Sequence, residues 1–127
     1  MGTSQLKILV VDDEEDARIG LSRMLRAKGY EVIELSRGGE VLQKAKSEWP
    51  ALIILDIVLP DIPGTQVFKT LRADPITKMI PVMLLTAKPD IVGEIPTFEQ
   101  KSDRYFEKPG RMDELLDTVH QMLTGKK

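Results

Sequence analysis

Cysteine is absent from the 127 residues, and histidine occurs once, at His120. Without thiols, the chain forms no disulfide and offers neither a thiolate nucleophile nor the sulfur ligands of a structural zinc site. A single imidazole is also too few for a histidine-rich metal centre. These absences exclude the thiol-based and histidine-based classes of site.

An excess of basic charge is also missing. Lys and Arg number 18 against 20 Asp and Glu, which gives a net charge of −2. Because nucleic acids and membrane surfaces attract a basic excess, we expect direct binding to neither. No apolar run approaches the ~20 residues that span a bilayer, and the polar segment Met1–Gln5 does not resemble a signal peptide. We therefore expect a cytoplasmic protein.

Short apolar runs, rich in β-branched and aliphatic residues, recur along the chain. Such runs are typical of strands that are covered on both faces of a sheet. Four runs are clear, and a fifth is weaker. The predicted strands are Leu6–Val11, Glu31–Leu35, Leu52–Leu55, Pro81–Leu85 and, more weakly, Arg104–Glu107.

Between these runs, apolar residues recur with a helical period. Gly29 is well placed to end the first helix, and Ser36 to cap the start of the second. The four apolar stripes are Ala17, Leu21, Met24 and Leu25; then Val41, Leu42 and Ala45; then Val67, Phe68 and Leu71; and last Leu115, Leu116, Val119, Met122 and Leu123.

The alternation of strands and helices predicts the fold class. It favours an α/β domain in which helices cover both faces of a doubly wound parallel sheet. With 42% hydrophobic residues and no linker or repeat, the chain has enough apolar side chains for one core. Sheets of this kind bind ligands at the carboxyl ends of their strands.

Polar residues stand where four of the predicted strands end. Taken singly, each has a plainer explanation, as a first-turn helix acid, a turn residue, a cap or a solvated lysine. Because the carboxyl ends of parallel strands share one edge, together they predict a single crevice. These residues are Asp12 and Asp13 after the first strand, Asp56 after the third, Thr86 after the fourth and Lys108 after the fifth.

Carboxylates that are gathered in one crevice repel each other unless a cation lies between them. Oxygen ligands without Cys or His suit Mg²⁺, which prefers an octahedral shell and keeps several waters. Glu14, Glu15 and Asp16 follow directly, and we interpret them as first-turn helix residues rather than ligands.

Four motifs in this order resemble the receiver domain of two-component response regulators. They are VVDD (Val10–Asp13), LDIVLPDIPG (Leu55–Gly64), LLTA (Leu84–Ala87) and YFEKP (Tyr105–Pro109). The resemblance covers essentially the whole chain. It implies a single receiver domain over residues 1–127, with a flavodoxin-like (βα)5 fold and a five-stranded parallel sheet.

The resemblance also implies the chemistry. Asp56 would accept a phosphoryl group from a sensor histidine kinase or a phosphotransfer protein. Asp13 and Asp56 would bind Mg²⁺ directly, Asp12 would act through a water molecule, and the backbone carbonyl of Val58 would be a further ligand. The domain would then be a signalling module rather than an enzyme, catalysing only its own phosphorylation and slow dephosphorylation.

Four further residues have roles that the resemblance alone suggests. Lys108 would pair with Asp56 and then with the phosphoryl oxygens, and Thr86 would hydrogen-bond the phosphoryl group. Tyr105 would move inward as the domain switches, and Pro109 would shape the loop after Lys108. The changed surface would bind an unknown downstream protein or output domain, or a second copy of the chain in a phosphorylation-dependent homodimer.

Three other functions compete with this one. An aspartate phosphatase on a similar sheet would need a second acid two residues after its nucleophile, where Val58 stands. A receiver-like module that no longer accepts phosphate would lack Asp13, Asp56 or Lys108, and all three are present. A nucleotide-binding domain would need a glycine-rich turn after the first strand, where this chain has DDEED.

Two further expectations concern the second half of the chain. Pro89, Gly93 and Pro96 crowd the segment Lys88–Pro96, whereas the family has a fourth helix at roughly Asp90–Gln100, so we expect that helix to be short or broken. We expect no output domain after Leu123 within this sequence, and the alternatives of a complete single-domain regulator and a piece of a larger one both stay open.

Overall fold

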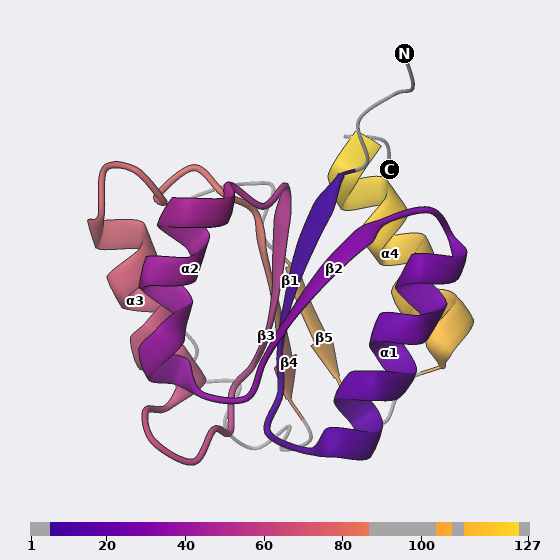
Figure 1. Cartoon of the computed structure of the whole chain (residues 1–127), viewed down its shortest axis with the longest axis horizontal. Coiled ribbons are helices and arrows are strands. Elements are labelled where there is room, and N and C mark those ends of the chain that lie inside the picture. The colour runs from indigo at the N-terminus through magenta and orange to yellow at the C-terminus, as the bar shows by residue number, and fades with distance from the viewer. Residues whose placement is uncertain (1–5, 87–103, 108–110, 125–127) are drawn as a thin grey trace.

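The computed structural model describes residues 6–86, 104–107 and 111–124. Strands and helices alternate along it as the sequence predicts (Figure 1). The predicted fourth helix near Asp90–Gln100 lies outside the described residues, so the label α4 belongs to the last helix of the chain. The elements are β1 (Lys7–Val11), α1 (Glu15–Ala27), β2 (Glu31–Leu35), the 3-10 turn η1 (Gly38–Glu40), α2 (Val41–Glu48), β3 (Leu52–Asp56), α3 (Gly64–Ala73), β4 (Val82–Thr86), β5 (Arg104–Glu107) and α4 (Met112–Thr124).

The five strands form one parallel sheet in the order β2-β1-β3-β4-β5. Figure 1 shows α1 and α4 on one face of the sheet and α2 and α3 on the other. The chain therefore winds outward in both directions from β1 and β3, which are adjacent in the sheet although β2 lies between them in sequence. This arrangement confirms the predicted doubly wound α/β fold.

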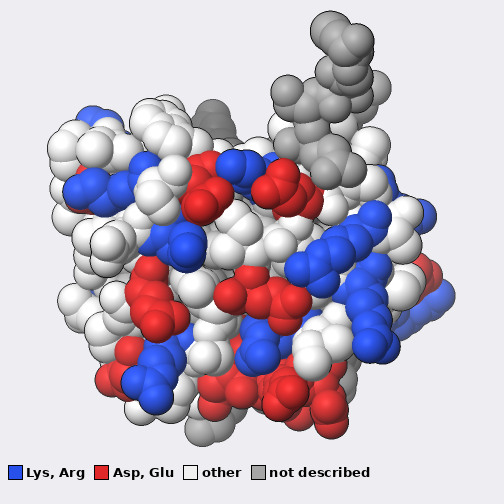
Figure 2. All heavy atoms as spheres, viewed as in Figure 1, with Lys and Arg blue, Asp and Glu red and all other residues white. Residues whose placement is uncertain are grey.

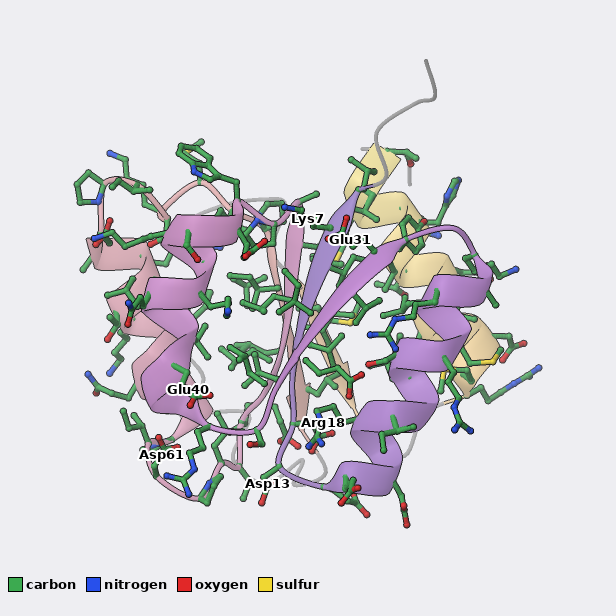
Figure 3. All side chains as sticks on the ribbon, in the orientation of Figure 1. Lys7, Asp13, Arg18, Glu31, Glu40 and Asp61 are labelled. Carbon is green, nitrogen blue, oxygen red and sulfur yellow. The ribbon has the colours of Figure 1, made fainter. Side chains whose placement is uncertain are left out.

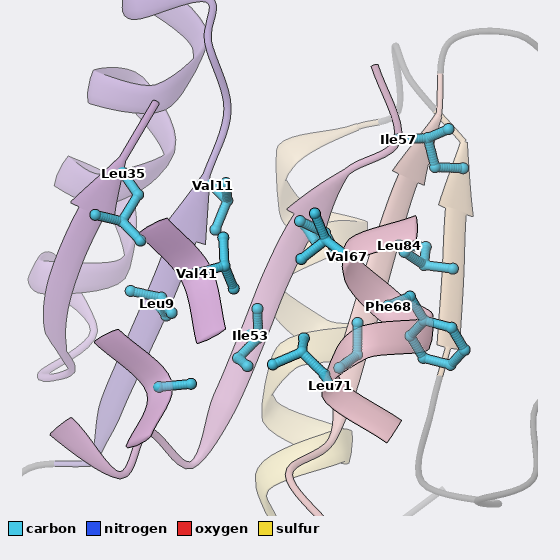
Figure 4. Packing of buried hydrophobic residues seen from close by; sticks show 13 residues of the cluster. Leu9, Val11, Leu35, Val41, Ile53, Ile57, Val67, Phe68, Leu71 and Leu84 are labelled. Carbon is cyan, nitrogen blue, oxygen red and sulfur yellow. The ribbon is translucent and has the colours of Figure 1, made fainter. Parts of the chain in front are cut away.

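Alternating side chains of each strand divide the core into two layers. In β1, Leu9 and Val11 pack with α2 and α3, whereas Ile8 and Val10 pack with α1 and α4. Figure 4 shows the first of these layers, in which Phe68 of α3 lies among the strand side chains. Every residue of β3 is buried, as expected for a central strand with helices on both faces.

Helix α1 ends where the sequence predicts, but its buried face is different in one respect. Gly29 has a φ of +97°, and its N–H donates to the carbonyl of Arg26, which closes the helix. Leu21 and Leu25 are buried, but Met24, which the apolar stripe included, is 42% exposed. Ser22 is buried instead, so the buried face of α1 is rotated toward Ser22 relative to the apolar stripe.

The predicted cap at Ser36 is wrong. Helix α2 begins at Val41, after the turn η1, and Ser36 is too far from its first N–H groups to bond them. The carboxylate of Asp61 caps the turn instead. Its two oxygens accept the N–H groups of Gly38 and Gly39 at 2.8 and 2.9 Å.

Candidate functional site

Three carboxylates meet at the carboxyl end of the sheet. Asp12 and Asp13 directly follow β1, and Asp56 is the last residue of β3. Because these strands are parallel neighbours, their ends lie side by side. One carboxylate oxygen from each residue lies within 4.8 Å of the others.

The backbone around Asp12 and Asp56 holds their side chains in place. Asp12 is 3% exposed and Asp56 is 7% exposed. The N–H of Glu14 donates to Oδ1 of Asp12 at 3.0 Å, and the N–H of Val58 donates to Oδ1 of Asp56 at 3.0 Å. The main-chain N–H of Asp12 also donates to the carbonyl of Leu35 at 3.0 Å, which ties the end of β1 to β2.

Asp13 differs from these two aspartates because its side chain is exposed. In the part of the chain that the structure describes, its carboxylate takes part in no hydrogen bond or ion pair. Its position therefore depends on the backbone that precedes it.

The loop after β3 folds back tightly against the end of that strand. The N–H of Gly64 donates to the carbonyl of Ile57 at 2.6 Å, which closes the loop. A Cβ at Gly64 would overlap the main-chain oxygen of Asp56, so only glycine allows this approach. Val58 lies within the loop and is 48% exposed, and the role of its carbonyl as a metal ligand stays a prediction.

The other predicted site residues are placed only in part. Thr86 is the last residue of β4, one residue beyond Leu85, which pairs with Asp56 of β3. This register places the Thr86 backbone at the same edge as the carboxylates. Tyr105 lies in β5, paired with Leu84. Lys108 and Pro109 lie outside the described residues, and their roles stay predictions.

The cluster has the chemistry of a site for a divalent cation. Two of its carboxylates are buried, and like charges that are held this close are unfavourable without a counter-charge. An all-oxygen donor set with one side open to water suits Mg²⁺, which keeps several of its waters. Figure 2 shows further acidic side chains along the lower edge of the molecule, where Asp13 and the first turn of α1 lie.

Two supporting residues were missed in the sequence analysis. Arg18, in the second turn of α1, donates to the carbonyl of Asp12 at 2.9 Å, and Asp61 caps η1 from the loop after β3. Figure 3 shows Asp13, Arg18 and Asp61 at one end of the sheet, with Lys7 and Glu31 at the opposite end. No local pattern indicated either contact, because α1 also carries Arg23 and Arg26 and the sequence does not distinguish Arg18 from them.

A doubly wound parallel sheet with three carboxylates at the ends of β1 and β3 defines a class of phosphoryl-transfer and metal-binding modules. Residues 8–120 match the family model described as the response regulator receiver domain. The chain belongs to this family, and it is a receiver domain of two-component signalling.

Relatives and solved structures agree with this assignment. The chain is 44% identical over 103 residues to the alkaline phosphatase synthesis transcriptional regulatory protein PhoP of Bacillus subtilis. That match covers 81% of this chain but only 42% of PhoP. Protein PilH of Pseudomonas aeruginosa is 32% identical over 119 residues, which covers 94% of this chain and 98% of PilH.

A solved structure of the response regulator TrrA from Thermotoga maritima, in complex with Mg²⁺ and BeF, superimposes with a TM-score of 0.80. It is 34% identical, and the match covers 94% of this chain and all of TrrA. No helix within the described residues has the length and apolar character that a membrane span needs.

Proposed function

We propose that Asp56 is the phosphoacceptor of this receiver domain and that Mg²⁺ binds beside it. The observation that carries the proposal is the cluster itself, in which Asp56 ends a buried strand within 4.8 Å of Asp12 and Asp13. Because the chain belongs to the receiver family, we interpret this carboxylate cluster as a phosphorylation site.

In the proposed reaction, an Asp56 carboxylate oxygen attacks the phosphorus of a phosphohistidine. The new O–P bond forms as the P–N bond breaks, and the electron pair passes to the imidazole nitrogen, which takes up a proton. Transfer of this kind depends mostly on positioning and on charge stabilisation. The hydrogen bond from the Val58 N–H to Oδ1 supports the positioning, because it fixes the rotation of the acceptor carboxylate.

Asp13 and Asp56 would bind Mg²⁺ directly, Asp12 through a water molecule, and the Val58 carbonyl would complete the protein ligands. When bound, the ion would supply positive charge to the transferring phosphoryl group. The carboxylate oxygens fit this role in number, type and proximity. The Mg²⁺ in the related TrrA structure is consistent with the proposal.

The switch belongs to the same proposal. Lys108 and Thr86 would contact the phosphoryl oxygens, and Tyr105 would respond to the movement of Thr86, with Pro109 shaping the loop. The backbone of Thr86 supports its assignment, because it ends β4 next to the strand of Asp56. A charge added at one point would then alter a distant surface.

The partners follow from this chemistry. Receiver domains receive phosphate from histidine kinases and act on downstream effectors, and we propose both for this chain, with a histidine kinase or phosphotransfer protein as the donor. A downstream protein, an output domain or a second phosphorylated copy would read the switched surface. The single domain over residues 1–127 and the cytoplasmic location stay part of the proposal.

Labelling with acetyl phosphate and Mg²⁺, followed by mass spectrometry, tests the acceptor. We expect one phosphoryl adduct per chain that hydroxylamine removes, and none on Asp56→Asn. Asp113→Asn, an exposed carboxylate on α4, is the matched control and should label like the parent. Efficient labelling of Asp56→Asn would refute the assignment.

A further inference from the structure

We propose that Arg18 is the positioning residue of the cation site, because it holds the peptide that joins Asp12 to Asp13. This inference rests on the proposed Mg²⁺ site. The Nη1 of Arg18 donates to the carbonyl oxygen of Asp12 at 2.9 Å, and its Nε donates to Oε1 of Glu34 at 3.2 Å. The Arg18 side chain is 17% exposed, so water competes little for these bonds.

The carbonyl of Asp12 matters because it belongs to the same planar unit as the N–H of Asp13. A peptide bond stays planar, so holding its oxygen fixes the ψ angle of Asp12 and thereby the positions of the N and Cα atoms of Asp13. The N–H of Asp12 is already tied to β2 through Leu35, and its Oδ1 to the N–H of Glu14. Arg18 thus holds the carbonyl, the one remaining backbone group of Asp12.

Asp13 gains most from this support. Its carboxylate is exposed, and among the described residues it has no bond of its own. The direction of its side chain toward Asp56 is therefore set by the backbone. Two contacts of Asp12 restrain that backbone: the Arg18 bond to its carbonyl and the bond from the Glu14 N–H to its Oδ1.

Glu34 holds the far side of the guanidinium and balances its charge. Its Oε2 also accepts from Nη2 of Arg26 at 3.3 Å, so it lies between two arginines of α1. The planar fork of arginine bonds two acceptors from separate nitrogens at fixed angles, whereas an ammonium presents all its donors from one freely rotating nitrogen. Glu34 is part of β2, next to β1 in the sheet, so the bridge is anchored in the sheet as well as in the helix.

The sign of the effect separates positioning from simple electrostatics. A positive charge near a cation site weakens cation binding, so removing it should strengthen Mg²⁺ binding if charge alone matters. If Arg18 positions Asp13, removing it should weaken binding instead. Partners that orient metal ligands typically contribute 10- to 100-fold in affinity, and we expect about tenfold at this open site.

The experiment measures Mg²⁺ affinity by calorimetry in the parent chain and in Arg18→Met, Arg18→Lys and Arg26→Met. We expect Arg18→Met to bind Mg²⁺ about tenfold more weakly than the parent. Arg18→Lys should recover only part of the affinity, since it keeps the charge but not the fork. Arg26→Met is the matched control, because it also loses one charge and one bond to Glu34 but does not touch Asp12.

A second readout needs no metal. In the metal-free protein, the backbone amide resonance of Asp13 should shift and the Glu14 amide should exchange faster in Arg18→Met, whereas both should match the parent in Arg26→Met. If the parent itself binds no Mg²⁺, the proposed function fails. If the parent binds Mg²⁺ and Arg18→Met binds it equally well or more tightly, the inference is overturned and the proposed function stands. Should Arg18→Met not fold, unchanged affinity and amide shifts in Arg18→Lys overturn it.

Discussion

Asp61, on the loop after β3, accepts a hydrogen bond of 2.8 Å from the N–H of Gly38, at the start of η1. Its second oxygen accepts the next N–H, that of Gly39, at 2.9 Å. The loop that follows the proposed phosphoacceptor is thereby tied to the loop that follows β2. A Cβ at Gly38 would lie 2.8 Å from the side chain of Val67, so this close approach also requires a small residue.

The first prediction concerns this carboxylate. The N–H groups of Gly39 and Gly38 hold the pKa of Asp61 below its ordinary value of 3.8. A lowered folded pKa stabilises the fold above pH ~3.8, and this stabilisation is lost as the pH falls through the folded pKa. We expect Asp61→Ala to lower the thermal midpoint at pH 7, and the difference from the parent to shrink below pH ~3.8.

Thermal melts from pH 2 to 8 measure this difference. Asp113→Ala is the control, since its carboxylate is 64% exposed and pairs with the nearby, exposed Arg111. If the thermal midpoints of Asp61→Ala and the parent differ by the same amount at every pH, the Asp61 carboxylate is not the source of the pH dependence.

Most of the fold was predictable from the sequence, because the signals for it are local. Continuous apolar runs indicated the strands, and the alternation with helical stripes indicated a parallel sheet. Strand bounds moved by only one residue, so that Asp56 and Thr86 became the last residues of their strands. The meeting of Asp12 with Asp56 followed from one topological rule about where parallel strands end.

The contacts that support the site could not be predicted in the same way. Asp61 and Gly38 are 23 residues apart, and their bond depends on how two loops cross. The prediction for Ser36 failed for this reason, because a distant carboxylate caps the turn in its place. Met24 is exposed because of how α1 packs against the sheet, and the helical period of the apolar residues does not determine that packing.

The second prediction concerns Gly64 and its contact with the acceptor strand. A methyl group there would overlap the main-chain oxygen of Asp56, so the loop must move. We expect Gly64→Ala to destabilise the fold by roughly 1–3 kcal/mol and to slow phosphorylation as well. Urea unfolding and acetyl phosphate labelling measure the two effects.

Gly20 supplies the control for Gly64. It lies within α1, and a Cβ there would meet nothing within 4 Å. Gly20→Ala should therefore stabilise the fold by about 0.5–1 kcal/mol, since alanine loses less backbone entropy in a helix. If both alanine variants change stability by the same amount in the same direction, the close packing of Gly64 is not the cause.

The third prediction separates metal binding from stability at Asp13. We expect Asp13→Asn to weaken Mg²⁺ binding at least about tenfold, because one charged oxygen ligand is lost. Without Mg²⁺ the same variant should be slightly more stable than the parent, by up to about 1 kcal/mol, because a like charge near two buried carboxylates is removed. Calorimetric titration and metal-free melts give the two numbers.

Asp16→Asn is the matched control for this variant. It removes an exposed carboxylate from the first turn of α1, outside the cluster. It should leave Mg²⁺ affinity almost unchanged and should not stabilise the metal-free protein, because an acid at a helix N-terminus is favourable. Equal losses of affinity in the two variants would indicate a diffuse acidic surface rather than a defined site.

The last prediction concerns how long the phosphoryl group stays on Asp56. Val58, two residues further on, is 48% exposed and carries no group that could orient an attacking water. We therefore expect phosphorylated protein to persist for minutes or longer after the phosphodonor is removed, and a loss within seconds would contradict this. Val58→Asn adds an amide at the same point and should hasten the decay several-fold, because a placed polar group can hold water in line for attack. Val58→Ala separates the two explanations for slow decay. If the valine acts only by shielding the site, the alanine variant should decay as fast as the asparagine variant; if the missing polar group is the cause, it should decay like the parent.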